Sequence, residues 1–193
     1  MRKLTYYVAA SIDGFIAGPD GQYEFFPMEP DVMAAMNEAR PETVPTHLRQ
    51  AAGVADAPNR EFDTVVMGRG TYQPALAQGI TSPYAHLTQY VFSRTLDPVS
   101  DPAVHIVADD PVELVRRLKA RPGLGIWLCG GGKLAAQLMP EIDEIVVKRY
   151  RVVAGAGIPM FDGPFAPVPF VVTQSRTFDS GAVVTTYARA SAG

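Results

Sequence analysis

The sequence contains one cysteine and three histidines among its 193 residues, and it has no long apolar run. The single cysteine, Cys129, cannot form an internal disulfide, and no cysteine or carboxylate stands at metal-ligand spacing from a histidine. We therefore predict no metal centre and a reducing, cytoplasmic location. No stretch approaches the roughly 18 apolar residues of a membrane-spanning helix, which argues against a membrane location.

An excess of positive charge is also missing, since 17 Lys and Arg stand against 20 Asp and Glu, for a net charge of −3. Binding to a nucleic-acid backbone normally requires such an excess, so nucleic acid is not an expected partner. The hydrophobic fraction of 47% and the charged fraction of 19% fit one soluble domain covering residues 1–193. The 17 glycines and 17 prolines predict a fold rich in turns.

Strand and helix patterns alternate over the first two thirds of the chain. Strands are expected at residues 4–11, 62–67, 89–93, 104–108 and 125–129. Helices are expected at residues 30–40, 46–55 and 111–120, and directly after residues 69 and 132. This alternation predicts an α/β domain with a mostly parallel central sheet.

The pattern changes after Pro140 to long strands, at residues 144–153, 168–178 and 182–189. The last two strands are joined by a probable hairpin turn, so we expect an antiparallel end on one sheet edge. The basic cluster at residues 148–151 is expected on a solvated strand edge. Residues 12–21 are expected to form a mobile covering loop, because turn signals flank a short apolar patch.

The strongest functional signal is the run Gly130-Gly131-Gly132, between a strand and a helix that begins with Lys133 and Leu134. Glycines leave room for a ligand, and backbone N–H groups at a helix N-terminus attract phosphate. This favours a nucleotide pyrophosphate site, while a tight turn without a ligand is the alternative. The run matches neither a Walker loop nor a Rossmann fingerprint.

A second glycine turn, Gly68-Arg69-Gly70-Thr71, also follows a predicted strand. Arg69, Ser93 and Arg94 all lie just past the carboxyl ends of predicted parallel strands, where open α/β sheets bind ligands. Two guanidinium groups and a hydroxyl could hold a 2′-phosphate. The alternative is that these arginines are solvated or paired with nearby aspartates.

Candidates for acid–base chemistry are few. Asp13 lies in the turn after the first strand, and Asp31 lies at the start of the helix that follows the covering loop. Both have ordinary structural explanations, since Asp-Gly is a common turn and aspartate caps helix starts. Either could still contact substrate.

Three motifs in order resemble those of the dihydrofolate reductase-like superfamily, which includes the reductase domain of bacterial riboflavin biosynthesis. They are residues 9–17 (AASIDGFIA), 66–72 (VMGRGTY) and 129–134 (CGGGKL). Residues 155–161 and the closing hairpin also resemble the uncharacterised branch of that superfamily. The resemblance covers nearly the whole chain and implies a three-layer α/β fold.

The resemblance implies NADPH as the hydride donor and a pteridine, pyrimidine or related small heterocycle as substrate. Asp13 is the first candidate for substrate contact or proton relay, and Asp31 is the second. The residues implied in cofactor binding are Ala9, Ile16, Gly68, Arg69, Thr71, Ser93, Arg94, Gly130, Gly131, Gly132, Lys133 and Leu134.

The sequence also departs from parts of the superfamily. A tryptophan-containing loop is missing before the acidic helix, which argues against folate itself. No zinc-binding deaminase domain is present, which excludes the bifunctional riboflavin enzyme. A non-catalytic NADP(H)-binding or redox-sensing module is the main alternative, and a nucleotide hydrolase is a weaker one. Family analogy suggests a homodimer.

Overall fold

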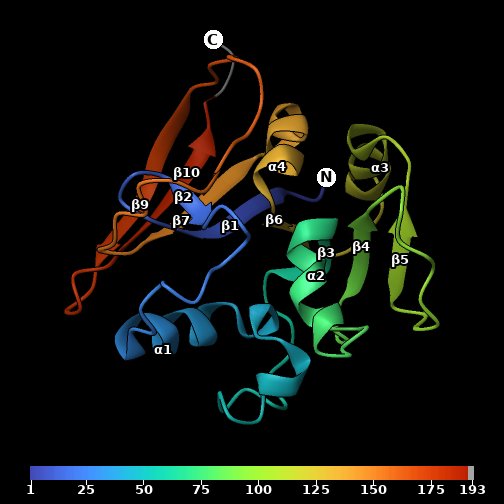
Figure 1. Cartoon of the computed structure of the whole chain (residues 1–193), viewed down its shortest axis with the longest axis horizontal. Helices are drawn as coiled ribbons and strands as arrows, with labels where there is room; N and C mark the ends of the chain where they lie inside the picture. The colour runs from blue at the N-terminus through green and yellow to red at the C-terminus, as the bar shows by residue number, and fades with distance from the viewer. Residues whose placement is uncertain (191–193) are drawn as a thin grey trace.

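The computed structural model describes residues 1–190, and its centre is an eight-stranded sheet in the order β5-β4-β3-β6-β1-β7-β10-β9 (Figure 1). The strands are β1 (Leu4–Ala10), β3 (Phe62–Gly68), β4 (Thr88–Phe92), β5 (Val104–Val107), β6 (Gly125–Gly130), β7 (Glu144–Arg149), β9 (Phe170–Thr177) and β10 (Val183–Arg189). The strands from β5 to β7 are parallel, and β10 is antiparallel to both β7 and β9. The predicted mostly parallel sheet with an antiparallel C-terminal hairpin is therefore confirmed.

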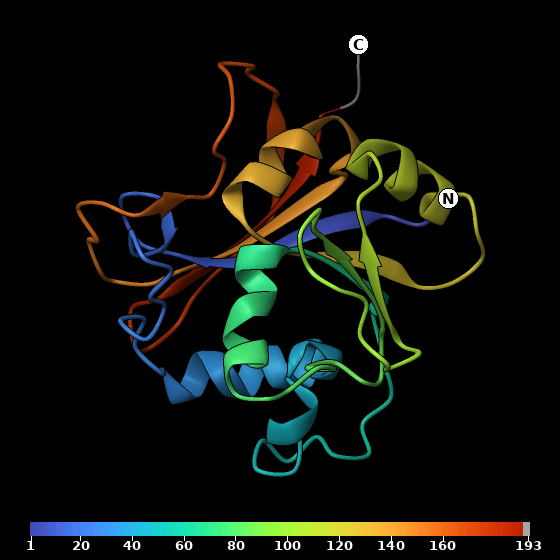
Figure 2. The ribbon, with the colours of Figure 1, turned by 45° about the vertical axis from the view of Figure 1, so that its right-hand side comes forward.

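Helices cover both faces of the sheet and complete three layers (Figure 2). On one face, α1 (Pro30–Ala39) and α2 (Arg69–Ala77) pack through Val32 and Tyr72 into a core cluster with Trp127. On the other face, α3 (Pro111–Lys119) and α4 (Gly132–Gln137) pack through Leu118 and Leu134 into a second cluster. No helix within residues 1–190 is long and apolar enough to cross a membrane.

The start of α3 follows the predicted local chemistry. Asp110 caps the helix, and its carboxylate accepts hydrogen bonds from the backbone N–H groups of Val112 at 2.8 Å and Glu113 at 3.1 Å. Pro111 occupies the first turn, where a missing N–H costs no helical hydrogen bond. The start of this helix could be predicted because its signals, Asp110 and Pro111, are adjacent in the sequence.

Three expectations about secondary structure are wrong. Residues 46–55 form only a short 3-10 turn, η2 (Thr46–Leu48), because the following chain wraps around the buried Arg49. The guanidinium of Arg49 donates to the carbonyl oxygens of Pro41 at 2.7 Å and Ala57 at 2.6 Å. Strand β7 ends at Arg149 rather than at residue 153. The expected mobile loop contains a strand, β2 (Phe15–Ala17), which pairs antiparallel with β8 (Ile158–Pro159).

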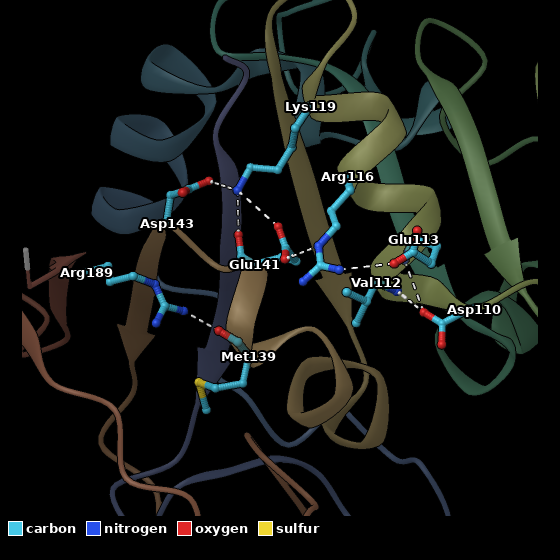
Figure 3. A network of polar contacts seen from close by, with 9 residues as sticks. All are labelled: Asp110, Val112, Glu113, Arg116, Lys119, Met139, Glu141, Asp143 and Arg189. Atoms are coloured by element: carbon cyan, nitrogen blue, oxygen red, sulfur yellow. Dashed lines mark hydrogen bonds and ion pairs between the residues drawn. The ribbon is translucent and has the colours of Figure 1, made fainter. Parts of the chain in front are cut away.

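A polar network joins α3, β7 and β10 at the amino ends of the parallel strands (Figure 3). The buried Lys119 ammonium lies 2.7 Å from the Asp143 carboxylate and donates to the carbonyl oxygen of Glu141 at 2.9 Å. Glu141 belongs to the short turn η3 (Met139–Glu141), whose first carbonyl oxygen accepts from Arg189. These contacts fix the edge of the sheet opposite to the glycine turns.

The long connection between α1 and β3 is closed by the buried side chain of Glu42, in the turn η1 (Pro41–Thr43). Its carboxylate accepts from the backbone N–H groups of Glu61 at 2.7 Å, Phe62 at 2.8 Å and Arg60 at 3.3 Å. Residues 42–59, which had no assigned role in the sequence, thus form a loop that is pinned to the first residue of β3.

We predict that Glu42→Ala lowers the free energy of unfolding by about 3 kcal/mol, because three backbone donors lose their acceptor in a buried position. Urea unfolding followed by circular dichroism measures this loss. Glu38→Ala, on the exposed side of α1, is the matched control and should change the value by less than about 0.5 kcal/mol. Equal effects of the two variants would contradict this role for Glu42.

Candidate functional site

The two glycine turns lie side by side at the carboxyl edge of the sheet. Gly68 ends β3 next to Phe92 of β4, and Met67 pairs in register with Gly130 of β6. These neighbours bring the ends of β3, β4 and β6 together, and with them Arg69, Thr71, Ser93 and Arg94. The structure therefore gathers at one edge the residues that the sequence predicts for phosphate binding.

Glycine occupies the positions at this edge for different physical reasons. Gly130 has φ +147°, a conformation that other residues rarely adopt. A Cβ on Gly132 would lie 2.2 Å from the Pro159 carbonyl oxygen, so close packing alone requires glycine there. A Cβ on Gly131 would meet only the Thr71 hydroxyl, at 3.7 Å, and a Cβ on Gly68 nothing nearer than 3.8 Å. A Cβ at Gly68 or Gly131 would thus make only ordinary van der Waals contacts, so packing does not by itself require glycine at either position.

Cationic side chains follow the same strand ends. Arg69 donates to the Thr95 hydroxyl at 2.6 Å, and Arg94 and Lys133 are exposed. Within residues 1–190, none of these three cations forms an ion pair with a carboxylate. The alternative pairing with Asp63 does not occur for Arg69, because Asp63 pairs with Arg2 at the opposite edge of the sheet.

The remaining predicted cofactor residues differ in burial and in the groups that they could offer to a ligand. The Ser93 hydroxyl accepts from the backbone N–H groups of Thr95 at 3.2 Å and Leu96 at 3.1 Å, and it keeps its own hydrogen to donate. Ala9 is half-buried at the carboxyl end of β1, and Ile16 in β2 packs partly on the core. The Leu134 side chain is buried in the core, so only its backbone could face a ligand.

Asp13 is held by its surroundings as an acceptor. Its carboxylate accepts from the Ser11 hydroxyl at 2.6 Å and from the backbone N–H groups of Ala154 at 3.0 Å and Gly155 at 2.8 Å. These hydrogen bonds, the one from Ser11 first, lower the pKa of Asp13 from 3.8 to about 2. The contacts tie the turn after β1 to the segment after β7 and favour a structural role. Proton relay through Asp13 stays an untested prediction.

Asp31 links the start of α1 to the C-terminal hairpin. Its carboxylate accepts from the backbone N–H groups of Val32 at 2.8 Å and of Ser180, in the hairpin turn, at 2.9 Å. The bond from Ser180 is the main cause that lowers the pKa of Asp31. Contact of Asp31 with substrate stays a prediction.

A group of side chains that the sequence analysis did not combine lies on the α1 face of the sheet, next to the glycine turns. We call it the Lys148 cluster; it consists of Tyr7, Tyr84, Cys129, Lys148 and Tyr150. The Lys148 ammonium lies 4.3 Å from the centre of the Tyr7 ring. Burial raises the pKa of the Cys129 thiol to about 12, so this thiol is protonated at neutral pH.

The prediction that Lys148 lies on a solvated strand edge is wrong. Strand β7 is an interior strand, because it pairs with β1 on one side and with β10 on the other. Alternation then directs Lys148 to the same sheet face as Val146, which belongs to the core cluster under α1. The signal in the sequence was the break in alternation, a lysine two residues after a buried valine, but it required knowledge of the strand order.

A hollow of about 650 Å³ lies at the opposite edge of the sheet, between the amino ends of the strands. Its charged lining residues pair with one another, as Arg40 does with Glu61 at 3.1 Å and Lys3 with Glu144 at 3.9 Å. We assign no ligand to it. Within residues 1–190, no three His, Cys, Asp or Glu side chains gather as a metal site would require.

The chain belongs to the RibD C-terminal domain family, whose pattern it matches over residues 2–184. It is 31% identical over 166 residues to the uncharacterized protein YwjB of Bacillus subtilis (strain 168), with 83% of each chain covered. It is 28% identical to the uncharacterized protein YyaP of the same organism, covering 96% of this chain and 94% of YyaP. The dihydrofolate reductase-like identity expected from the motifs is confirmed.

Solved structures agree with this fold. A putative riboflavin biosynthesis protein from Shewanella sp. PV-4 superposes with a TM-score of 0.73 at 25% identity, covering 98% of this chain and 99% of that one. The diaminohydroxyphosphoribosylaminopyrimidine deaminase/5-amino-6-(5-phosphoribosylamino)uracil reductase from Thermotoga maritima gives a TM-score of 0.65 at 14% identity, over 98% of this chain and 57% of that one. The latter likeness concerns the fold alone. The family supports a reductase-like role.

We predict that the Asp13 carboxyl titrates near pH 2, well below its ordinary value of 3.8. Because the pKa is lowered in the folded protein, the contribution of the contact is complete above 3.8 and disappears as the pH falls through about 2. NMR titration from about pH 6 downward should show the amide signals of Ala154 and Gly155 moving only at the acid end. In Asp13→Asn these signals should not titrate. A midpoint near 3.8 in the unchanged protein would contradict the contact.

Proposed function

We propose that this chain is an NADPH-dependent reductase that transfers a hydride to a small heterocycle. The observation that carries the proposal is that packing does not require glycine at Gly68 or Gly131, at a sheet edge where Arg69, Arg94 and Lys133 form no ion pair with a carboxylate of residues 1–190. A pyrophosphate needs close approach to backbone and local positive charge, and this edge offers both.

The residues present fit the cofactor. Backbone N–H groups of Gly132, Lys133 and Leu134 lie in the first turn of α4, where no intrahelical acceptor exists, and would bind the pyrophosphate. Arg69, Ser93 and Arg94 would bind the 2′-phosphate. When bound, NADPH supplies the hydride, and the protein supplies orientation and exclusion of water.

The proposal predicts that Gly131→Asp raises the Kd for NADPH at least about tenfold, because a carboxylate would occupy the phosphate site and repel it. The fold has space for a Cβ at this position, so the variant should stay folded. Energy transfer from Trp127 to NADPH reports binding. Ser100→Asp, which adds the same charge at an exposed position outside the site, should bind NADPH as the unchanged protein does.

A second variant separates the 2′-phosphate from the rest of the cofactor. Arg94→Ala should weaken NADPH and leave the affinity for NADH within about twofold, since NADH lacks the 2′-phosphate. Absence of saturable NADPH binding to the unchanged protein would refute the proposal. Binding without NADPH oxidation across a screen of pteridines, flavins and aminopyrimidines would favour a non-catalytic binding or sensing module instead.

We also propose that the protein is a homodimer formed through β9. This strand is the last of the sheet, and Val171 and Val172 are 52% and 60% exposed on it. An edge strand with exposed apolar residues is a ready template for pairing, which natural proteins normally cover or charge. A second copy of the same edge is complementary to it by symmetry.

Light scattering after size-exclusion chromatography should give the mass of a dimer, and Val172→Lys should give a monomer, because a charged edge opposes strand pairing. Leu48→Lys, at a residue that is 47% exposed away from this edge, is the control and should remain dimeric. If the unchanged protein is monomeric at a chain concentration of about 100 μM, the proposed dimer is wrong.

A further inference from the structure

Lys148 is the feature that neither the fold nor the cofactor site explains. It lies on an interior strand, half-buried, with its ammonium 4.3 Å from the centre of the Tyr7 ring. Within residues 1–190 no carboxylate comes within ion-pair distance of it. A half-buried ammonium without an opposite charge loses part of its hydration, so a purely structural position would favour an apolar residue.

Lys119 shows how this protein satisfies a buried lysine when the role is structural. Its ammonium lies 2.7 Å from the Asp143 carboxylate and 3.8 Å from that of Glu141, and it donates to a carbonyl oxygen at 2.9 Å (Figure 3). Lys148 has a ring face in place of these partners. Burial acts to lower the pKa of Lys148, but the phenols of Tyr7 and Tyr150 outweigh it and raise the pKa. The ammonium is therefore charged at neutral pH.

The Lys148 cluster also opens toward the proposed cofactor site. Lys148 pairs in register with Ala9 across β1 and β7, and Ala9 is the residue expected to line the nicotinamide pocket. Cys129, in the same cluster, directly precedes Gly130. Ala9, Cys129 and Lys148 all keep part of their surface accessible although they lie on interior strands. A ring placed against them would lie between the aromatic side chains and the glycine turn.

We propose that the Lys148 cluster is the acceptor-binding site, and that Lys148 is a catalytic residue that binds an oxo group conjugated to the double bond being reduced. This inference rests on the proposed function and specifies its substrate class as planar oxo-heterocycles. The rings of Tyr7 and Tyr150 would lie behind the acceptor, and the ammonium provides a charged donor at this position.

The chemistry balances with the reductant already proposed. NADPH, when bound, would supply the hydride, which would form a C–H bond at a ring carbon while the π bond at that carbon breaks. The electron pair of that bond would move through the conjugated system onto the oxo oxygen, where the Lys148 ammonium would stabilise the developing negative charge. A proton from water would complete the dihydro product, and the cofactor would be left as NADP⁺.

Binding of two pteridines of the same size tests the inference without requiring turnover. Lumazine carries oxo groups at ring positions 2 and 4, and 2,4-diaminopteridine carries amino donors there. Fluorescence titration should show that the unchanged protein prefers lumazine by at least about tenfold, because an ammonium can donate to an oxo oxygen and repels a donor. Lys148→Met should abolish this preference, and Lys148→Arg should keep most of it.

Two further readouts separate substrate binding from a structural role. Lys148→Met should melt at the same temperature as the unchanged protein or higher, since it removes an unpaired buried charge. It should bind NADPH with unchanged affinity, as should the control Lys3→Met, whose side chain is 69% exposed at the opposite edge. Failure of NADPH binding refutes the proposed function by itself. If Lys148→Met keeps the full preference for lumazine, or if the unchanged protein shows no preference, the role of Lys148 is wrong whether or not NADPH binds.

Discussion

The position of β1 between β6 and β7 is the constraint on which the rest of the structure depends. Both pairings are parallel, so the three strands end at the same edge and deliver the glycine turn, Ala9 and Lys148 to it. Side chains alternate between the two faces along each strand. A slip of one residue between β1 and β7 would send Lys148 to the opposite face, under α4, and leave the core below α1 incomplete. Register therefore fixes the chemistry of the edge as well as the packing.

The sequence predicted the elements whose signals are local. Glycine turns mark the ends of β3 and β6, and Asp110 with Pro111 marks the start of α3. The wrong predictions concern segments whose conformation depends on distant partners. The helix predicted at residues 46–55 does not form, and the buried guanidinium of Arg49 instead binds the carbonyl oxygens of Pro41 and Ala57, which lie on either side of that segment. The strand β2 exists only because β8, far along the chain, pairs with it.

The same difference between local signals and distant partners applies to the residues of the candidate site. Residues of the edge proposed to bind phosphate could be found from the sequence, because each follows a recognisable strand end. The Lys148 cluster could not, because its members come from β1, β6, β7 and a loop before β4, and nothing in their spacing joins them. Because β7 is an interior strand, Lys148 of the basic stretch faces the core side of the sheet. Asp13, the acidic residue of the first motif, accepts hydrogen bonds from two backbone N–H groups.

Charge is distributed between the two edges of the sheet in a way that the net value of −3 conceals. At the amino edge, cations are matched by carboxylates, as in the pairs of Arg2 with Asp63, Arg40 with Glu61 and Lys119 with Asp143. At the carboxyl edge, Asp13 and Asp31 accept hydrogen bonds from backbone N–H groups, while Arg69, Arg94 and Lys133 form no ion pair with a carboxylate of residues 1–190. Under the proposed function, these three cations would stabilise the phosphates of the cofactor. The net charge does not oppose this, because charge that is matched within one edge contributes little at the other.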